Sequence, residues 1–351
     1  MITSSQTRLL ELLGIELPII QAPMAGSSTP EMTIAVSEAG GLGSLPSAQY
    51  DESGLRAALD RVQAGTRRPI NLNFFSHSNP ADDPERQSAW LQRLAGYYVE
   101  AGLDSDMLKP ATGRTPFDAT AASVVEDYRP EVVSFHFGLP PVDLLDRVKR
   151  TGAKIFSSAT TVAEARWLAE RGVDAIIAMG AEAGGHRGSF LTDEMSEQIG
   201  TFALVPQVVD AVSIPVIAAG GISDRRGVIA AFALGAAAVQ VGTAYLFTPE
   251  AKISPVYRKA LGMGERPTAL TNLFTGRPAR GIVNRAMAEL GPLSELSPPF
   301  PTAGTALGPL RSAAEAAGRD DFSPLWAGQS FPLARPMPAA TLTRMLAGAD
   351  I

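Results

Sequence analysis

VIAAGGISDRRGVIAAFALGAAAVQVGTAYL, which spans residues 216–246, contains two short apolar runs separated by an amphipathic stretch. The runs Val216–Gly221 and Ala238–Leu246 are almost continuously apolar, as strands of a parallel sheet covered on both faces are. Between them, residues 224–233 have helical spacing, with Asp224 where an N-cap is expected. This stretch therefore predicts a strand, a helix and a second, parallel strand.

The same alternation recurs along the chain. The predicted strands are Pro18–Ala25, Leu42–Pro46, Ile70–Phe75, Val132–Gly138, Lys154–Ala159, Ala175–Gly180, Val216–Gly221 and Ala238–Leu246. The predicted helices are 30–39, 51–64, 141–151, 161–171, 201–212 and 224–233, with N-caps at Thr161 and Asp224 and stops at Gly40, Gly152, Gly172 and Gly235. Eight strands alternating with helices favour the α/β class and a closed (β/α)₈ TIM barrel. An open, doubly wound sheet is the second possibility.

Two segments are longer than a βα repeat requires. Residues 76–130 separate the third and fourth strands and look helical around 85–101 and 117–128, which predicts a helical insertion. Residues 247–351 are rich in Pro, Gly and Ala and are expected to hold the last barrel helices and a C-terminal extension that packs back onto the barrel. We expect one domain over residues 1–351, since barrels tolerate such insertions.

Composition and charge exclude several functions. The chain of 351 residues is 45% hydrophobic and 19% charged, which fits a globular protein with a sizeable core. A net charge of −6 without a dense Lys/Arg run argues against nucleic acid as a partner. The absence of cysteine excludes disulfides and thiol catalysis. No membrane helix or signal peptide is predicted, so a cytoplasmic protein is expected. Acidic residues do not cluster at strand ends, so no catalytic metal is expected.

The loop after the sixth strand is the most informative one. Residues 179–188, MGAEAGGHRG, place glycines around a His-Arg pair directly after a buried strand. Glycines expose backbone N–H groups to an anionic or electron-rich ligand, and histidine titrates near neutrality. His186 is therefore the predicted general base, and a flexible loop with a surface histidine is the alternative. Of the other two histidines, His136 follows an inward-facing pattern, whereas His77 is expected to be exposed to solvent.

Other strand ends carry further candidates. Pro23, Met24 and Ala25 follow the first strand and would let the backbone approach a flat ligand, although an ordinary turn explains them too. Asn73 lies on one face of the third strand and offers a donor and an acceptor to a heterocycle, or is simply a buried, backbone-bonded asparagine. His136 ends the fourth strand, either at the active-site mouth or as a hydrogen-bonded core histidine.

Two glycine-bearing loops follow the seventh and eighth strands. Gly220 and Gly221 lie in one loop, and Gly242 and Thr243 in the other. TIM barrels often bind phosphate with these two loops, because their open backbone amides and a helix N-terminus favour an anion. The pair predicts a phosphate site. The chain has no early G-x-G-x-x-G turn, which disfavours a Rossmann nicotinamide domain.

The motifs resemble, in order, those of the class I nitronate monooxygenases, formerly called 2-nitropropane dioxygenases. The matching stretches are QAPMAG, NLNF, SFHFG, GAEAGGHRG, AAGGI and QVGTA, within residues 17–246, with a weaker echo at Trp326–Gln329. The resemblance implies an FMN enzyme that oxidises alkyl nitronates, such as propionate 3-nitronate, with O₂ to a carbonyl compound and nitrite. It also implies that His186 is the catalytic residue, either as a base toward a neutral nitroalkane or, when protonated, as a group that steadies an anionic nitronate, and that His136 lies in the substrate-binding pocket.

The resemblance also assigns the flavin contacts. The expected cofactor-binding residues are Pro23, Met24, Ala25, Asn73, Met179, Gly184, Gly185, Gly220, Gly221, Gln240, Gly242 and Thr243. Met179 departs from the family, which usually has Gln there, and this implies altered flavin tuning or substrate choice. Arg187 either suits an anionic nitronate electrostatically, together with His186, or is a structural salt-bridge partner, which is the favoured alternative.

Two other functions remain open. An FMN-dependent NAD(P)H enoyl-thioester or quinone reductase of the same barrel superfamily shares the Gly-Gly-His loop. A flavin- or phosphate-binding regulatory barrel without catalysis is the non-enzymatic alternative. Beyond substrate and O₂ no partner is predicted, and a monomer or homodimer is expected.

Overall fold

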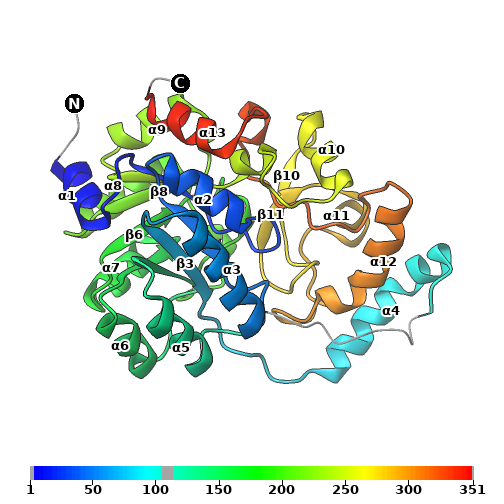
Figure 1. The fold of residues 1–351 in the computed structure, drawn as a ribbon. Coiled ribbons are helices and arrows are strands. Elements are labelled where there is room, and N and C mark those ends of the chain that lie inside the picture. The colour runs from blue at the N-terminus through cyan, green and yellow to red at the C-terminus, as the bar shows by residue number, and fades with distance from the viewer. Residues whose placement is uncertain (1–3, 105–113, 350–351) are drawn as a thin grey trace.

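The eight predicted strands form a single parallel barrel in the computed structural model, which describes residues 4–104 and 114–349. The strands follow the order β1-β9-β8-β6-β5-β4-β3-β2 (Figure 1). Their bounds are β1 (Ile19–Gln21), β2 (Gly43–Pro46), β3 (Ile70–Phe75), β4 (Val132–His136), β5 (Lys154–Ala159), β6 (Ala175–Met179), β8 (Val216–Ala219) and β9 (Ala238–Val241). The backbone N–H of Gln21 donates to Leu42 O at 3.0 Å, which joins β1 to the start of β2 and closes the barrel. The open sheet is thereby excluded.

Several strands end earlier than predicted, for local backbone reasons. β4 stops at His136 because Phe137 takes a left-handed conformation with φ 72°. β8 stops at Ala219 because Gly220 has φ 106°. The prediction that the last strand reaches Leu246 is wrong, since the chain turns at Gly242 into the 3₁₀ helix η3 (Thr243–Phe247).

The predicted helices cover the outside of the barrel. They are α2 (Pro30–Glu38), α3 (Glu52–Gly65), α6 (Val142–Arg150), α7 (Val162–Glu170), α8 (Thr201–Ala211) and α9 (Arg225–Ala233). Both predicted N-caps are confirmed: Thr161 accepts a hydrogen bond from Glu164 N, and Asp224 accepts from the next helical N–H groups. The glycines at the four predicted stops all have positive φ, which a side chain disfavours.

One end of the barrel interior is covered by a helix that the sequence did not predict. α1 (Ser4–Leu13) buries Leu9 and Leu13 in one cluster with inward-facing strand residues such as Phe156 and Ile217. A separate, larger cluster lies between the strands and the outer helices. Because α1 and these apolar side chains fill the interior near the N-terminal ends of the strands, a ligand can enter only near the C-terminal ends of the strands.

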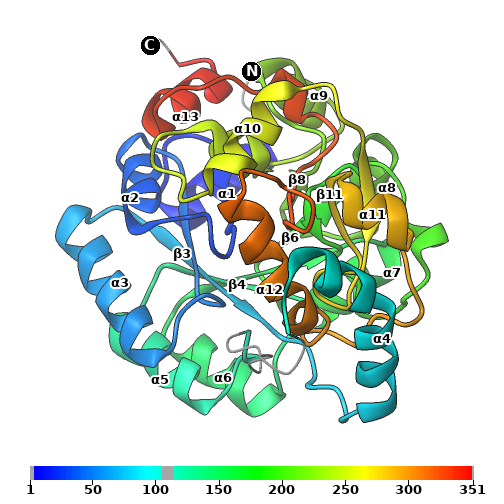
Figure 2. The same ribbon diagram turned by 90° about the vertical axis from the view of Figure 1, so that its right-hand side faces the viewer.

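The insertion and the C-terminal extension share a third apolar cluster beside the barrel. α4 (Pro84–Ala101) contributes Trp90, Leu94 and Tyr98, and α12 (Gly304–Ala316) contributes Leu307 and Leu310. The Tyr98 hydroxyl donates to the backbone of α12 at 2.5 Å. Figures 1 and 2 both show α4 and α12 side by side, and Figure 1 shows the pair away from the outer helices α6 and α7. The helix predicted at 85–101 is confirmed, whereas residues 105–113 of the insertion lie outside the described residues.

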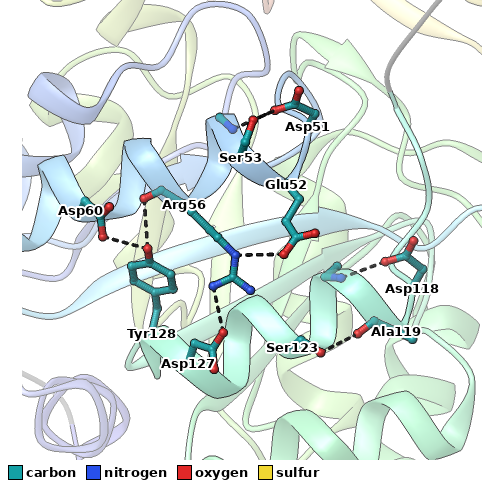
Figure 3. A network of polar contacts seen from close by, with 12 residues as sticks. Asp51, Glu52, Ser53, Arg56, Asp60, Asp118, Ala119, Ser123, Asp127 and Tyr128 are labelled. Carbon is teal, nitrogen blue, oxygen red and sulfur yellow. Dashed lines mark hydrogen bonds and ion pairs between the residues drawn. The ribbon is translucent and has the colours of Figure 1, made fainter.

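The second helix of the insertion, α5 (Ala119–Tyr128), is tied to α3 on the barrel surface (Figure 3). Arg56 of α3 bridges Glu52, at 2.9 Å, and Asp127, at 2.8 Å. The Tyr128 hydroxyl donates to Asp60 at 2.7 Å. α5 thus serves as the outer helix that leads into β4.

The extension covers the C-terminal ends of the barrel strands and then returns to the outer side of the barrel. Its elements are α10 (Pro255–Met263), β10 (Thr268–Thr271), β11 (Ala279–Ile282), α11 (Arg285–Leu290), α12, the 3₁₀ helix η4 (Phe331–Leu333) and α13 (Ala339–Ala347). α13 packs against α2 and α9, as predicted for a segment that returns to the barrel. Within the described residues, none of the helices has the length and apolar character needed to cross a bilayer.

Candidate active site

A pocket opens at the C-terminal ends of the barrel strands, and its empty space is about 1300 Å³ when the part open to solvent is included. Every residue predicted to bind cofactor or substrate or to act in catalysis lines it: Pro23, Met24, Ala25, Asn73, His136, Met179, Gly184, Gly185, His186, Gly220, Gly221, Gln240, Gly242 and Thr243. No Asp or Glu belongs to its described lining. The barrel therefore brings these distant strand ends together, while their individual roles remain predictions.

His186 lies in a short strand rather than in a flexible loop. β7 (Gly185–His186) pairs with β11 of the extension, with His186 opposite Ala279. The imidazole Nε2 lies 2.9 Å from the Thr275 hydroxyl, which itself donates to Arg277 O at 3.3 Å. Assigning the one proton of that hydroxyl to Arg277 O makes Nε2 the protonated nitrogen and leaves the lone pair on Nδ1. Among the described residues Nδ1 has no hydrogen-bond partner, so it is free to accept a proton in the pocket.

Burial and nearby cations keep His186 neutral. Burial lowers the pKa of His186 well below 6.5, and the charge of Arg114 lowers it further. The neutral imidazole is the form that accepts a proton, so the surroundings favour a base over an imidazolium that steadies an anion.

Both ring nitrogens of His136 are occupied by the protein. Nε2 lies 3.3 Å from the backbone oxygen of His186, which only accepts, so this nitrogen is the donor. Nδ1 therefore accepts from the Ser158 hydroxyl at 2.7 Å. Burial lowers the pKa of His136 to about 3. His136 thus lines the pocket as predicted, and it supports the backbone of His186 from β4.

His77 contradicts the prediction of a solvent-exposed side chain. It is 6% exposed and packs against Phe300, with ring centroids 4.7 Å apart. Phe75 and Phe137 complete the contacts, and neither ring nitrogen has a partner among the described residues. Burial lowers the pKa of His77 to about 4. The prediction failed because Phe300 of the extension covers a segment that is polar in sequence.

The Arg187 side chain binds to the protein itself and does not line the pocket. It is fully buried, and its guanidinium donates to Met179 O and Gly180 O, each at 2.7 Å, and to Gln198 Oε1 at 3.0 Å. Its structural role is as expected, but its partners are carbonyl oxygens instead of a carboxylate. Arg187 thereby fixes the end of β6 and the loop that presents His186.

The loops after β8 and β9 have the features of a phosphate cradle. Gly220 and Gly221 have φ of 106° and 71°, a conformation that a side chain disfavours. Thr243 opens η3, and its hydroxyl accepts from Gly328 N at 3.0 Å, which leaves its proton for a ligand. Gln240 Oε1 on the pocket wall is buried without a partner in the part of the chain that the structure describes. These features fit a planar ligand that carries a phosphate.

The sequence did not identify the contribution of the extension and the insertion to this pocket. Tyr257, Trp326, Gly328 and Ser330 line it from the extension, and Arg114 lines it from the insertion. The Trp326 ring centroid lies 5.6 Å from that of His186. The stretch around Trp326 matched the family weakly, and this was the one signal that could have located it.

Comparisons with known proteins agree with this geometry. The nitronate monooxygenase family model matches residues 6–348. A nitronate monooxygenase from Pseudomonas aeruginosa is 43% identical over 342 residues, which cover 97% of each chain. The structure of a nitroalkane oxidase from Streptomyces ansochromogenes is 38% identical with a TM-score of 0.86, over 97% of this chain and 96% of that one. FabK from Thermotoga maritima is more distant, with 28% identity and a TM-score of 0.71 over 97% and 94% of the two chains.

The family match includes the extension as well as the barrel, in keeping with the extension's share of the pocket wall. On this match and on the likeness to enzymes over nearly the whole length, the chain belongs to the nitronate monooxygenase family.

Proposed function

We propose that this protein is an FMN-dependent oxidoreductase that oxidises alkyl nitronates, such as propionate 3-nitronate, with O₂ to a carbonyl compound and nitrite. The observation that carries the proposal is the free Nδ1 of His186 in a pocket whose described lining has no carboxylate. An anionic nitronate is not repelled there, and a neutral nitroalkane meets a base.

FMN is the proposed cofactor. Gly220, Gly221, Gly242 and Thr243 would surround its phosphate, with backbone amides as donors. Asn73 would lie among the residues beside the flavin ring. When bound, FMN supplies the electron transfer and the reaction with O₂ that no side chain offers.

His186 is the proposed base toward neutral nitroalkanes, whose carbon must lose a proton before oxidation. A preformed nitronate has already lost this proton. We therefore expect His186→Asn to reduce kcat/KM for nitroethane by about 100-fold or more, within the usual contribution of a general base, and for ethylnitronate much less. Steady-state O₂ uptake with both substrates is the measurement. An equal loss on the two substrates would show that His186 is not the base.

A purified sample tests the assignment directly. We expect a yellow protein with FMN in about one-to-one ratio, and O₂ uptake with nitrite release on propionate 3-nitronate. We also expect NADH and NADPH to leave the flavin oxidised under anaerobic conditions. Colourless protein that does not bind added FMN would contradict the cofactor assignment. Rapid bleaching by NAD(P)H without nitrite release would favour a reductase. The cytoplasmic location and the monomeric or homodimeric state remain predictions.

A further inference from the structure

Arg114 is the one Lys or Arg residue in the described lining of the pocket. Its backbone N–H donates to Ala48 O, in the loop after β2, at 3.3 Å. Its guanidinium carbon lies 5.8 Å from the ring centroid of Phe300. The His186 ring lies 5.3 Å from the same Phe300 ring. Arg114 and His186 are thus near neighbours, with Phe300 in contact with both.

The Arg114 guanidinium has no ion pair and no hydrogen-bond acceptor within the described ranges. Other arginines around the site are satisfied: Arg187 by two backbone oxygens and a side-chain amide, and Arg277 by Ser189 O and an ion pair with Asp193 at 3.8 Å. The charge felt most strongly at Arg114 is that of another cation, Arg311. A partly buried cation without a counter-ion is unfavourable, and a bound anion relieves this cost.

The spacing limits the length of the anion. The two contacts with Phe300 limit the separation of the Arg114 guanidinium carbon and the His186 ring centre to about 11 Å. A spacer of two or three carbons at about 1.5 Å per bond, with a contact of about 3–4 Å at each end, reaches a separation at this upper limit, and a longer spacer exceeds it. The side chains of Phe75 and Trp326, which line the pocket near His186, suit the apolar spacer.

We propose that Arg114 binds a carboxylate at the far end of the substrate and makes the enzyme selective for short nitronates with a terminal carboxylate over unsubstituted alkyl nitronates. The proposal rests on the proposed nitronate oxidation. A guanidinium matches a carboxylate because its N–H groups form two parallel, charge-assisted hydrogen bonds. Arg114 is thus a specificity-determining residue, and the proton transfer at His186 does not involve it.

The test compares two substrates of equal chain length, propionate 3-nitronate and propyl-1-nitronate, in which a methyl group replaces the carboxylate. For Arg114→Gln we expect kcat/KM on propionate 3-nitronate to fall by about 10- to 100-fold, the range for a charge-assisted pair. The loss should lie mainly in KM, because the contact is the same before and during the reaction. On propyl-1-nitronate the change should stay within about 3-fold, since no charge-assisted pair is lost. Arg114→Lys keeps the charge and should recover part of the selectivity.

A binding measurement supports the kinetics without turnover. Calorimetric titration with succinate, which has two carboxylates on a two-carbon spacer, should show weaker binding to Arg114→Gln than to the unaltered protein by a similar factor. Arg311→Gln is the matched control, because Arg311 is a nearby cation outside the described lining. It should change both nitronates equally.

Each outcome separates the two proposals. Failure of the unaltered protein to oxidise either nitronate overturns the proposed function. Oxidation of both nitronates with an unchanged ratio in Arg114→Gln overturns the role of Arg114 and leaves the proposed function standing. A loss of kcat/KM on propionate 3-nitronate alone in Arg311→Gln would also overturn direct contact between Arg114 and the carboxylate. The selectivity would then come from the summed positive charge near the pocket. If Arg114→Gln does not fold with bound FMN, the ratio of the two nitronates for Arg114→Lys and a succinate titration of Arg114→Lys decide.

Discussion

The Thr275 hydroxyl bears on which nitrogen of His186 carries the proton. It accepts from Nε2 at 2.9 Å and donates its own hydrogen bond to Arg277 O at 3.3 Å. The other tautomer would leave Nε2 facing an oxygen whose proton is already donated. Thr275 is therefore a positioning residue that holds Nδ1 available as the base, without touching the substrate itself.

Thr275→Val should weaken this control of the tautomer. We expect kcat/KM for nitroethane to fall by about 10-fold, in line with the loss of one hydrogen bond of 1–2 kcal/mol. The pH profile for nitroethane should also change, because the hydrogen bond that restrains the imidazole is gone. Steady-state O₂ uptake between pH 5 and 9 is the measurement.

Thr275→Ser retains the hydroxyl and should restore both the rate and the profile. If serine and valine behave alike, the hydroxyl has no such role, and the effect of valine comes from packing.

Among the elements, the loop after β6 and the segment Trp326–Gln329 of the extension depend on each other. A Cβ on Gly184 would lie 2.5 Å from Gly328 N and 2.6 Å from Ala327 C. Gln329 N donates to Glu182 O at 2.9 Å. These are backbone atoms on both sides, which cannot rotate aside as a side chain can. The close approach requires glycine and places Trp326 beside His186.

Gly184→Ala should therefore force the two segments apart. We expect a loss of about 1–3 kcal/mol in the free energy of unfolding, as for overpacking of a filled interior, and weaker FMN binding. Urea denaturation and FMN titration are the measurements.

The matched control is Gly262→Ala in α10, where an added Cβ meets nothing within 4 Å. This exchange should be neutral or stabilise the fold by up to about 1 kcal/mol, since alanine favours a helix. Equal effects of the two exchanges would show that the contact at Gly184 is not tight.

At the scale of the whole molecule, the three histidines make the free energy of unfolding depend on pH. Burial lowers the pKa of His77 to about 4, that of His136 to about 3, and that of His186 well below 6.5. In the unfolded chain each titrates near 6.5. Above that pH, both states carry neutral rings and histidine contributes no pH dependence. Below it, the unfolded chain takes up protons that the folded chain does not, so the free energy of unfolding decreases as the pH falls.

We expect the cofactor-free protein to lose stability between pH 7 and pH 5, with His77 alone accounting for on the order of 2 kcal/mol. Urea denaturation at the two pH values measures the loss. His77→Phe keeps an aromatic ring among Phe75, Phe137 and Phe300 and removes the titratable group. This variant should lose correspondingly less stability. An unchanged loss in His77→Phe would mean that His77 is protonated in the folded protein.

The sequence by itself determined the barrel and the positions that form its mouth. Eight apolar runs, two N-caps and four glycine stops are local features, and each follows from the chemistry of a few consecutive residues. Parallel strands place their C-terminal ends at one rim, so strand-end residues such as Asn73, His186 and Gly221 had to meet there. The same reasoning explains why strand ends were off by a few residues, since it cannot assign the φ of Phe137.

Only the tertiary structure decided how the pocket is completed. The partner of His186 is Thr275, 89 residues away, and the burial of His77 depends on Phe300. Arg114 and Trp326 reach the pocket from an insertion and an extension whose helices α4 and α12 have no counterpart in the βα repeat. Local periodicity carries no information on such long-range contacts, because the free energy that sets them comes from burying faces of distant segments against each other.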